Sequence, residues 1–309
     1  MMNWGSCLRA YFKLTLLVPS DHVAPFQLPE RSPGRLRLAL PVSNPLDHQG
    51  QGRRPLVSHP ALSPATYSMS HLTGRQRTQY VRRMFARIAP RYGLLNRLMT
   101  FGQDVRWRRE VIRRVGLAPG ARLLDLGSGT GDLAFESLRQ MPMARLVAAD
   151  STPEMISIGR ARPGGKAFPW IVADALHLPF ASQAFDAVVS GFLLRNVADL
   201  DQTLHEQHRV LRTGGCIVCL DTTPPRPGPF RFLMEFHLRR IIPLLGRLVA
   251  EDAEAYNYLP ESTEGFLSAE ILAKRMSAAG FREVGFALRM LGSVAIHWGK
   301  TEAALPVGS

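Results

Sequence analysis

Leu123-Leu124-Asp125-Leu126-Gly127-Ser128-Gly129-Thr130-Gly131-Asp132 is the segment of this 309-residue chain that best indicates its fold. The apolar run 122–126 has the length and composition of a buried strand. Three glycines at alternate positions follow it, and they let the backbone turn sharply and approach a ligand closely. Their spacing is G-x-G-x-G, whereas dinucleotide-binding proteins have G-x-G-x-x-G. The segment therefore predicts a strand, a tight ligand-binding turn and a helix that begins near Asp132.

Strand-like and helix-like patterns alternate along the rest of the chain. The predicted strands are 122–126, 145–149, 169–172, 187–191, 216–220, 283–290 and 293–298. Helical patterns cover 132–140, 153–162, 200–211, 230–250 and 268–279. This alternation predicts an α/β fold with a doubly wound, mostly parallel seven-stranded sheet. Ligands of such sheets bind at the carboxyl ends of the strands, so the residues at those ends are the candidate site.

Composition excludes several classes of protein. Hydrophobic residues make up 46% of the chain, which is enough for a sizeable core and argues against wholesale disorder. No apolar run approaches the roughly 18 residues of a membrane-spanning helix. Three cysteines, Cys7, Cys216 and Cys219, cannot form a disulfide framework, which indicates a reducing compartment. Cys216 and Cys219 lie three apart in one predicted strand, so their thiols should point to opposite faces and hold no metal.

The net charge of +13 is distributed unevenly. Residues 1–68 carry +4, residues 69–122 carry +11 and residues 123–309 carry −2. The sequence pI of about 10.6 suggests a nucleic acid or an anionic membrane surface as a partner. The excess of arginine over lysine is also what a GC-rich genome would produce. The charge therefore points to one basic segment and not to a property of the whole chain.

The chain divides into three regions. Residues 1–68 hold nine of the 23 prolines, no regular pattern survives that spacing, and we expect a disordered leader. It is either upstream sequence joined to a true start at Met69 or an Arg-rich transit peptide. Residues 69–122 are a basic helical N-terminal region, with helical patterns from Thr78 and from Asp104 to Val115. Residues 123–303 carry the α/β domain.

Acidic residues stand where the predicted strands end. Asp150 ends the second strand, where a carboxylate accepts both hydroxyls of a ribose. Asp174 follows the third strand beside Ala175, at the place where an adenine edge would be read. The sequence therefore predicts a nucleoside-binding site across neighbouring strands.

Four segments resemble the class I S-adenosylmethionine-dependent methyltransferases. They are D-L-G-S-G-T-G-D at 125–132, A-A-D-S-T-P-E-M at 148–155, A-D-A-L-H-L-P-F at 173–180 and F-D-A-V-V-S at 185–190. The resemblance implies that S-adenosylmethionine is the methyl donor and that no metal is needed. It implies cofactor binding by Asp125, Gly127, Gly129, Thr130, Asp150, Asp174 and Ala175, with Ser190 or Gly191 at the end of the fourth strand.

Four further segments are similar to the ubiquinone/menaquinone biosynthesis C-methyltransferases. The segments at 192–197 and 209–215 resemble F-G-L-R-N-V and R-V-L-K-P-G-G, the segment at 92–107 resembles Y-D-x-M-N…S-x-G-x-H-x-x-W, and the segment at 256–262 resembles Y-x-Y-L-x-E-S. Gly93, Asp104 and Thr213 depart from the Asp, His and Pro of those patterns. A gapless alignment also places Gly191, and not Ser190, at the family's serine.

The narrower resemblance implies methylation of a ring carbon on a polyprenylated quinol, with demethylmenaquinol to menaquinol as the favoured reaction. A polyprenyl benzoquinol in ubiquinone biosynthesis, another small molecule and, with less support, RNA remain as alternatives. The N/D-P-P-Y/F motif of base methyltransferases is missing at 191–194, so a nucleic-acid partner is disfavoured. The resemblance also places Arg195, Asn196 and Tyr92 around the ring.

Each of these three catalytic residues has a plainer alternative. A guanidinium keeps its proton at neutral pH, so Arg195 should stabilise a ring oxyanion or orient a water. Otherwise Arg195 forms a surface salt bridge. Asn196 would otherwise cap a helix, and Tyr92 would otherwise pack in the core.

The basic segment suggests a second partner. A polyprenyl quinol resides in the bilayer, so the helices at 82–114 are predicted to dock on anionic lipid and open an apolar path past Phe85, Leu94 and Leu98. A solvated helical face is the alternative. We expect a cytoplasmic protein, peripheral at the inner face of the membrane, or a protein of an organelle matrix if 1–68 is a transit peptide. A homodimer is left open.

Overall fold

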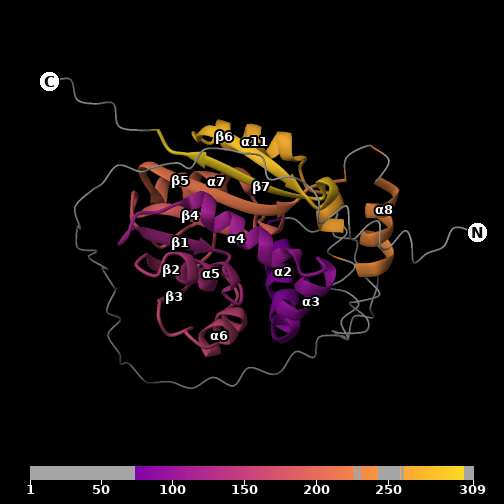
Figure 1. Ribbon diagram of the computed structural model, residues 1–309, viewed down its shortest axis with the longest axis horizontal. Helices are drawn as coiled ribbons and strands as arrows, with labels where there is room; N and C mark the ends of the chain where they lie inside the picture. The colour runs from indigo at the N-terminus through magenta and orange to yellow at the C-terminus, as the bar shows by residue number, and fades with distance from the viewer. Residues whose placement is uncertain (1–73, 226–227, 229–230, 243–257, 259–260, 303–309) are drawn as a thin grey trace, which may run out of the picture.

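The computed structural model of the chain is a twisted sheet with helices on both faces (Figure 1). The structure describes residues 74–225, 228, 231–242, 258 and 261–302. The predicted leader 1–68 and part of the helix predicted at 230–250 lie outside these described residues.

The sheet has seven strands. They are β1 (Arg122–Leu126), β2 (Arg145–Asp150), β3 (Trp170–Val172), β4 (Phe185–Gly191), β5 (Leu211–Thr222), β6 (Arg282–Arg289) and β7 (Val294–Lys300). Their order is β3-β2-β1-β4-β5-β7-β6, with β7 antiparallel to both of its neighbours and all other pairs parallel. The prediction of a doubly wound, mostly parallel seven-stranded sheet is therefore confirmed. The strand order reverses between β1 and β4, the place where such sheets bind ligands.

Helices cover both faces of the sheet, which explains why its central strands are continuous apolar runs. On one face lie α4 (Gln103–Val115) and α5 (Asp132–Gln140), whose core includes Trp107, Leu133 and Cys216. On the other lie α7 (Leu200–Val210) and α11 (Ala269–Ala278), whose core includes Leu204 and Cys219. The two thiols thus lie on opposite faces, as predicted, and burial raises the pKa of each to about 12.

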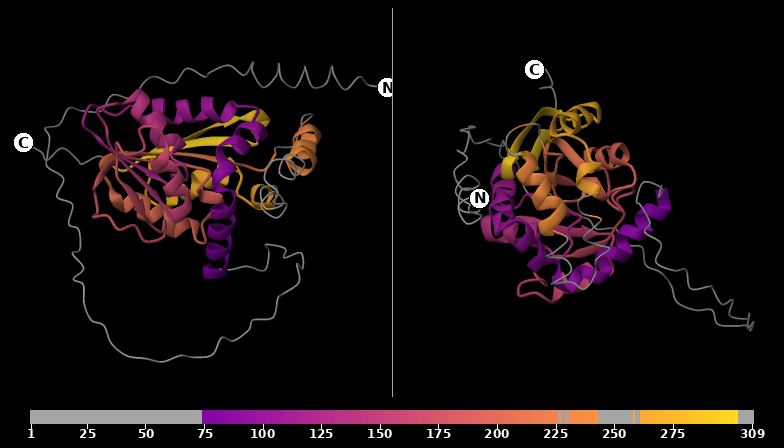
Figure 2. Two further views of the ribbon diagram at one scale, coloured as in Figure 1. Left: turned by 90° about the horizontal axis from the view of Figure 1, so that it is seen from below. Right: turned by 90° about the vertical axis from the view of Figure 1, so that its right-hand side faces the viewer.

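The N-terminal helices stand at the carboxyl ends of the strands (Figures 1 and 2). They are α2 (Gly74–Ile88), the short 3-10 turn η2 (Ala89–Arg91) and α3 (Tyr92–Met99). Pro90 breaks the helical path at η2, as its fixed backbone angle predicts. Both helices pack in a third core with Leu238 of the π-helix η4 (His237–Ile241), which continues the short helix α8 (Arg231–Phe236).

The arginines of the basic N-terminal region are not all exposed to solvent, so the region is not simply a solvated helical face. Arg108 is buried in ion pairs with Asp104 on its own helix and with Asp132 of α5, at 3.3 Å. Arg162 contacts the second oxygen of Asp132 at 2.7 Å. The exposed arginines of this region are Arg75, Arg82, Arg83, Arg87, Arg91, Arg97, Arg106, Arg109 and Arg113. Within the described ranges, no helix is long and apolar enough to cross a membrane.

Candidate active site

The glycine-rich turn after β1 forms the floor of the largest cluster of predicted site residues. Gly127 has a φ of +67°, and a Cβ there would lie 2.9 Å from Leu193 Cδ1. Gly131, with a φ of +88°, would place a Cβ 2.6 Å from Trp170. Both positions therefore need glycine for conformation and for space. Gly129 faces open space except for Tyr92, so the turn is closed behind and open toward a ligand.

Asp150, at the end of β2, ties this turn to the neighbouring strand. Its Oδ2 accepts a hydrogen bond from Gly129 N at 2.8 Å, and its Oδ1 accepts one from Thr152 N, also at 2.8 Å. Burial raises the pKa of Asp150. Each oxygen retains a lone pair, so the carboxylate has the capacity to accept two hydroxyl groups.

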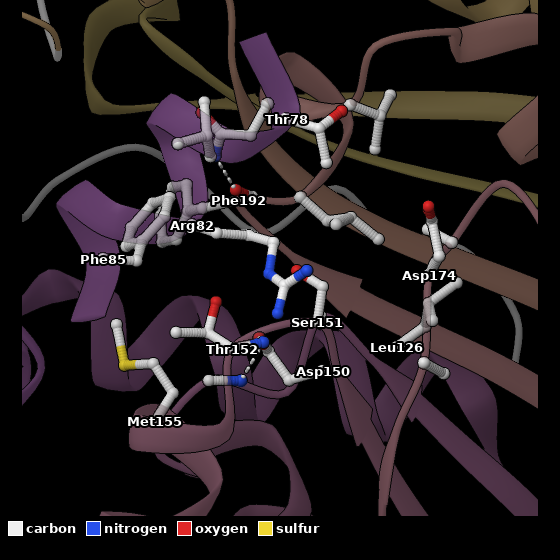
Figure 3. A pocket seen from close by; sticks show the side chains of 18 of the residues that line it. Thr78, Arg82, Phe85, Leu126, Asp150, Ser151, Thr152, Met155, Asp174 and Phe192 are labelled. Atoms are coloured by element: carbon white, nitrogen blue, oxygen red, sulfur yellow. Dashed lines mark hydrogen bonds between the residues drawn. The ribbon is translucent and has the colours of Figure 1, made fainter. Parts of the chain in front are cut away.

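The main pocket opens above this turn, at the switch between β1 and β4 (Figure 3). Its lining includes Gly127, Gly129, Asp150, Asp174, Ala175 and Gly191. Ser190 is buried in the strand and does not line it, because consecutive strand residues face opposite sides. Asp174 holds the turn after β3 through its Oδ1, which accepts a hydrogen bond from Leu176 N at 3.0 Å.

A smaller inner cavity lies beneath the main pocket and contains Asp125, Thr130 and Tyr92. The Asp125 side chain is fully buried, and neither of its oxygens makes a hydrogen bond within the described residues. Burial raises the pKa of Asp125 to about 8, and the nearby carboxyl groups of Asp150 and Asp132 act in the same direction. Arg108 also lines this cavity, but it is paired with Asp132 and Asp104, so the buried Asp125 carboxyl could still be stabilised by a cationic group of a ligand.

The turn, the paired acids and the inner cavity together fit S-adenosylmethionine. Asp150 has acceptor sites for the ribose diol, and Asp174 with Ala175 lies where the adenine would be. Asp125 has a buried carboxyl group, without a hydrogen-bond partner among the described residues, for the positively charged methionine end, beside Gly127, Gly129 and Thr130. The roles of these individual residues stay predictions.

Arg195 lies in η3 (Leu194–Asn196), the short turn after β4, and is only 5% exposed. Its Nη1 contacts Asp221 Oδ1 at 2.6 Å, and its guanidinium lies 5.0 Å from the centre of the Phe192 ring. The alternative of a surface salt bridge is therefore wrong, because the pair is buried. Its Nε is buried without an acceptor within the described residues.

Asn196 does not cap a helix. Its Nδ2 donates to Phe192 O at 2.7 Å, and its Oδ1 accepts a hydrogen bond from Tyr258 Oη at 2.6 Å. The cap of α7 is Asp199, which accepts from Gln202 N at 3.0 Å. Asn196 lines the main pocket, so the structure places it among the predicted cofactor residues.

Tyr92 begins α3 and lines both the main pocket and the inner cavity. Its ring makes an edge contact with Phe85 at 5.9 Å, and burial raises the pKa of its hydroxyl. Tyr92 therefore packs against neighbouring side chains, as its alternative role in the core predicted, and it also faces the two pockets.

A second, apolar pocket adjoins the main pocket and shares Phe192 with it. Its apolar lining includes Met99, Trp107, Phe192, Met234, Leu238 and Met290. Two donors in its wall, Arg195 Nε and Asn96 Nδ2, are buried without a partner within the part of the chain described. His237 also lines it and donates from Nε2 to Met99 O at 2.9 Å, while burial lowers its pKa and keeps the ring neutral.

Several residues of the site were missed by sequence reasoning. Arg82 was assigned to a lipid surface, yet it extends from α2 into the main pocket toward Ser151 (Figure 3). Asp221 was missed because the fifth strand was predicted to end at Leu220. Inspecting the residue after each strand would have found it. Tyr258 was noted as part of a motif, but only its contact with Asn196 reveals its place.

The fold and site define a class I S-adenosylmethionine-dependent methyltransferase. Among the described residues, no group of three or more His, Cys, Asp or Glu side chains could hold a metal ion. The chain belongs to the ubiE/COQ5 methyltransferase family, whose model matches residues 73–301.

Known proteins agree with this assignment. The "Ubiquinone/menaquinone biosynthesis C-methyltransferase UbiE" of Desulfotalea psychrophila is 46% identical over 219 residues, which cover 71% of this chain and 89% of that protein. The "Demethylmenaquinone methyltransferase" of Thermus thermophilus is 45% identical over 218 residues, covering 70% and 99%. A crystal structure of a SAM-dependent methyltransferase from Thermotoga maritima has a TM-score of 0.50 at 19% identity and covers 72% of this chain and 100% of that chain, which supports the fold alone.

Proposed function

We propose that this enzyme transfers a methyl group from S-adenosylmethionine to a ring carbon of a polyprenylated quinol, converting demethylmenaquinol to menaquinol. Relatives named for demethylmenaquinone and for ubiquinone/menaquinone biosynthesis support this substrate class. The naphthoquinol is favoured because the family members at 45% and 40% identity include several named demethylmenaquinone methyltransferases.

The observation that carries the proposal is the apolar pocket with two buried donors in its wall. A quinol is a flat apolar ring with two oxygens, and Arg195 Nε and Asn96 Nδ2 are donors that lack acceptors among the residues the structure describes. Leaving such groups unpaired costs about 1–3 kcal/mol each, so a ligand that supplies oxygen atoms would recover that energy. Phe192 borders both pockets, so a ring bound there lies next to the main pocket.

When bound, S-adenosylmethionine supplies an electrophilic methyl group. Asp125, Asp150 and the glycine turn would hold it, and the protein would place the acceptor carbon against it with water excluded. The Arg195 guanidinium would lie at the ring, where it would stabilise negative charge on a quinol oxygen as the adjacent carbon becomes nucleophilic. The ring carbon exchanges one hydrogen for methyl, so one proton leaves for each turnover.

We also propose that the N-terminal helices bring the site to an anionic membrane surface. Leu94 and Leu98 are 55% and 37% exposed on α3, although they are large apolar residues. The exposed residues Arg87, Arg91 and Arg97 flank them in sequence. Apolar side chains among cationic ones suit the boundary of an anionic bilayer, from which the polyprenyl quinol must be taken.

Complementation of mutants blocked in quinone methylation, followed by mass spectrometry of the lipids, tests the function. The full chain and a chain that begins at Met69 should both restore menaquinone in a host that accumulates demethylmenaquinone. Restoration of ubiquinone alone would shift the substrate to the benzoquinol. Unchanged quinones in every mutant, despite folded protein that binds S-adenosylmethionine, would refute the assignment.

A further inference from the structure

We propose that Asp221 and Tyr258 are positioning residues that fix Arg195 and Asn196 where the pockets meet. The inference rests on the proposed function, because it takes Arg195 and Asn196 to contact the bound molecules. Neither Asp221 nor Tyr258 was predicted as a site residue, and they come from two segments far apart in the chain.

Asp221 holds Arg195 through both its side chain and its backbone. The carboxylate is 1% exposed, and it accepts hydrogen bonds from Arg195 Nη1 at 2.6 Å and from Arg195 N at 3.2 Å. A third donor, Thr222 N, lies 2.8 Å from Asp221 Oδ1. The carboxylate is therefore itself fixed, and it commits Nη1 of the guanidinium while Nε has no partner within the described residues.

Tyr258 holds Asn196 in a comparable way. Its hydroxyl donates to Asn196 Oδ1 at 2.6 Å, while Asn196 Nδ2 donates to Phe192 O at 2.7 Å. Both ends of the amide are thus engaged, so the side chain cannot rotate without losing a hydrogen bond. Tyr258 is 2% exposed and belongs to the third core, which makes its hydroxyl a rigid anchor.

The segment that carries this pair needs such anchors. The turn η3 has only three residues, and Phe192 just before it has a φ of +59°, a conformation that costs energy for a residue with a side chain. Arg77 of α2 adds a further contact by donating from Nη2 to Arg195 O at 2.9 Å. Strand β5, Tyr258 and α2 therefore all converge on a short strained segment.

A buried ion pair is weak evidence for added stability, because desolvation offsets most of the attraction between the charges. Arg195 and Asp221 form such a buried pair, and Arg195 lines both the apolar pocket and a polar cleft next to it. The ion pair fixes the position of the Arg195 guanidinium, and a guanidinium that contacts substrate must be held in one position.

The test compares Asp221→Asn and Tyr258→Phe with a matched control in the full chain. The control is Asp186→Asn, which removes another buried carboxylate that pairs with Arg212 at 2.5 Å, at the opposite end of β4. We expect Asp221→Asn to lower kcat about 100-fold, as for a misplaced catalytic group, and Tyr258→Phe about 10-fold. The Kd for S-adenosylmethionine should stay within about threefold, Asp221→Glu should recover part of kcat, and Asp186→Asn should keep kcat.

A double variant separates positioning from a general loss of structure. If Asp221 acts through Arg195, Arg195→Ala with Asp221→Asn should be no slower than Arg195→Ala alone. Wild-type kcat in Asp221→Asn and Tyr258→Phe, or multiplied effects in the double variant, would overturn the inference. Wild-type kcat in Arg195→Ala would instead contradict the proposed role of Arg195 itself.

Discussion

At the level of single residues, two buried ionisable groups differ in their partners. Asp125 has no hydrogen-bond partner within the described residues, whereas Arg108 is buried between two carboxylates. The first group needs a ligand to compensate it, and the second is compensated by the protein. Substitution should therefore affect binding at Asp125 and stability at Arg108.

Binding of S-adenosylmethionine should become tighter as the pH rises from 6 to 8. The pKa of Asp125 is about 8 without ligand, and a cationic ligand favours the ionised carboxylate, so binding near pH 7 should release a proton. Calorimetry in two buffers of different ionisation enthalpy measures this release. Asp125→Asn should bind more weakly and release none, and equal proton release from both proteins would contradict the assignment.

The raised pKa of Asp125 also predicts how the stability of the protein depends on pH. The folded pKa of Asp125 lies above its unfolded value, so its contribution is complete below the unfolded pKa of about 3.8 and is lost as the pH rises through 8. Without ligand, the melting temperature of Asp125→Asn minus that of the wild type should therefore increase as the pH is raised from 6 to 9. A constant difference across this range would show that the carboxyl is not held neutral.

Arg108→Ala should destabilise the fold by about 3–5 kcal/mol, because it leaves Asp104 buried without its guanidinium partner and leaves Asp132 paired with Arg162 alone. Its neighbour Arg109 is exposed, and Arg109→Ala should change the free energy of unfolding by no more than about 0.5 kcal/mol. Urea unfolding of both variants measures the difference. Equal stabilities would mean that the ion pairs of Arg108 contribute nothing.

At the level of elements, the sheet was predictable because its central strands β1, β2 and β4 are apolar runs with a local signal. The placement of α2 was not, since its contacts are with residues far away in sequence, such as Arg195 and the lining of the main pocket. The same limit explains Arg108, whose partner Asp132 belongs to a different helix. The pattern of a single sequence indicates which side of a helix or strand is apolar. It does not indicate which elements contact one another, because that depends on how they pack in the fold.

Helix α2 contributes Thr78, Val81, Arg82 and Phe85 to the main pocket, so binding of S-adenosylmethionine should slow hydrogen exchange of its amides. Helix α11 lies on the far face of the sheet and serves as the internal control. Mass spectrometry of exchange with and without S-adenosylmethionine measures both. Protection limited to the strands and the glycine turn would show that α2 does not respond to the ligand.

At the scale of the whole molecule, charge and site are linked. The basic region that gives the chain its net charge also supplies α2 and Tyr92 to the site. A protein that reaches the membrane with this face would bring its pockets close to a lipid substrate.

Leu94→Ser with Leu98→Ser should weaken binding to vesicles that contain anionic lipid, because both exposed side chains would no longer enter the bilayer boundary. Co-sedimentation at varied anionic lipid content and salt measures this. Met143→Ser, a change at an apolar residue 68% exposed before β2, is the control and should bind like the wild type. Equal binding to neutral vesicles, or none to anionic ones, would contradict docking by charge and apolar contact.

The most direct test of the central claim is methyl transfer by the purified full chain to reduced demethylmenaquinol from S-adenosylmethionine carrying a deuterated methyl group. We expect a menaquinol that has lost its ring hydrogen and retains all three deuterium atoms on carbon. Tandem mass spectrometry should locate them on the ring. Label on a quinol oxygen, or no labelled quinol from folded protein that binds S-adenosylmethionine, would contradict it.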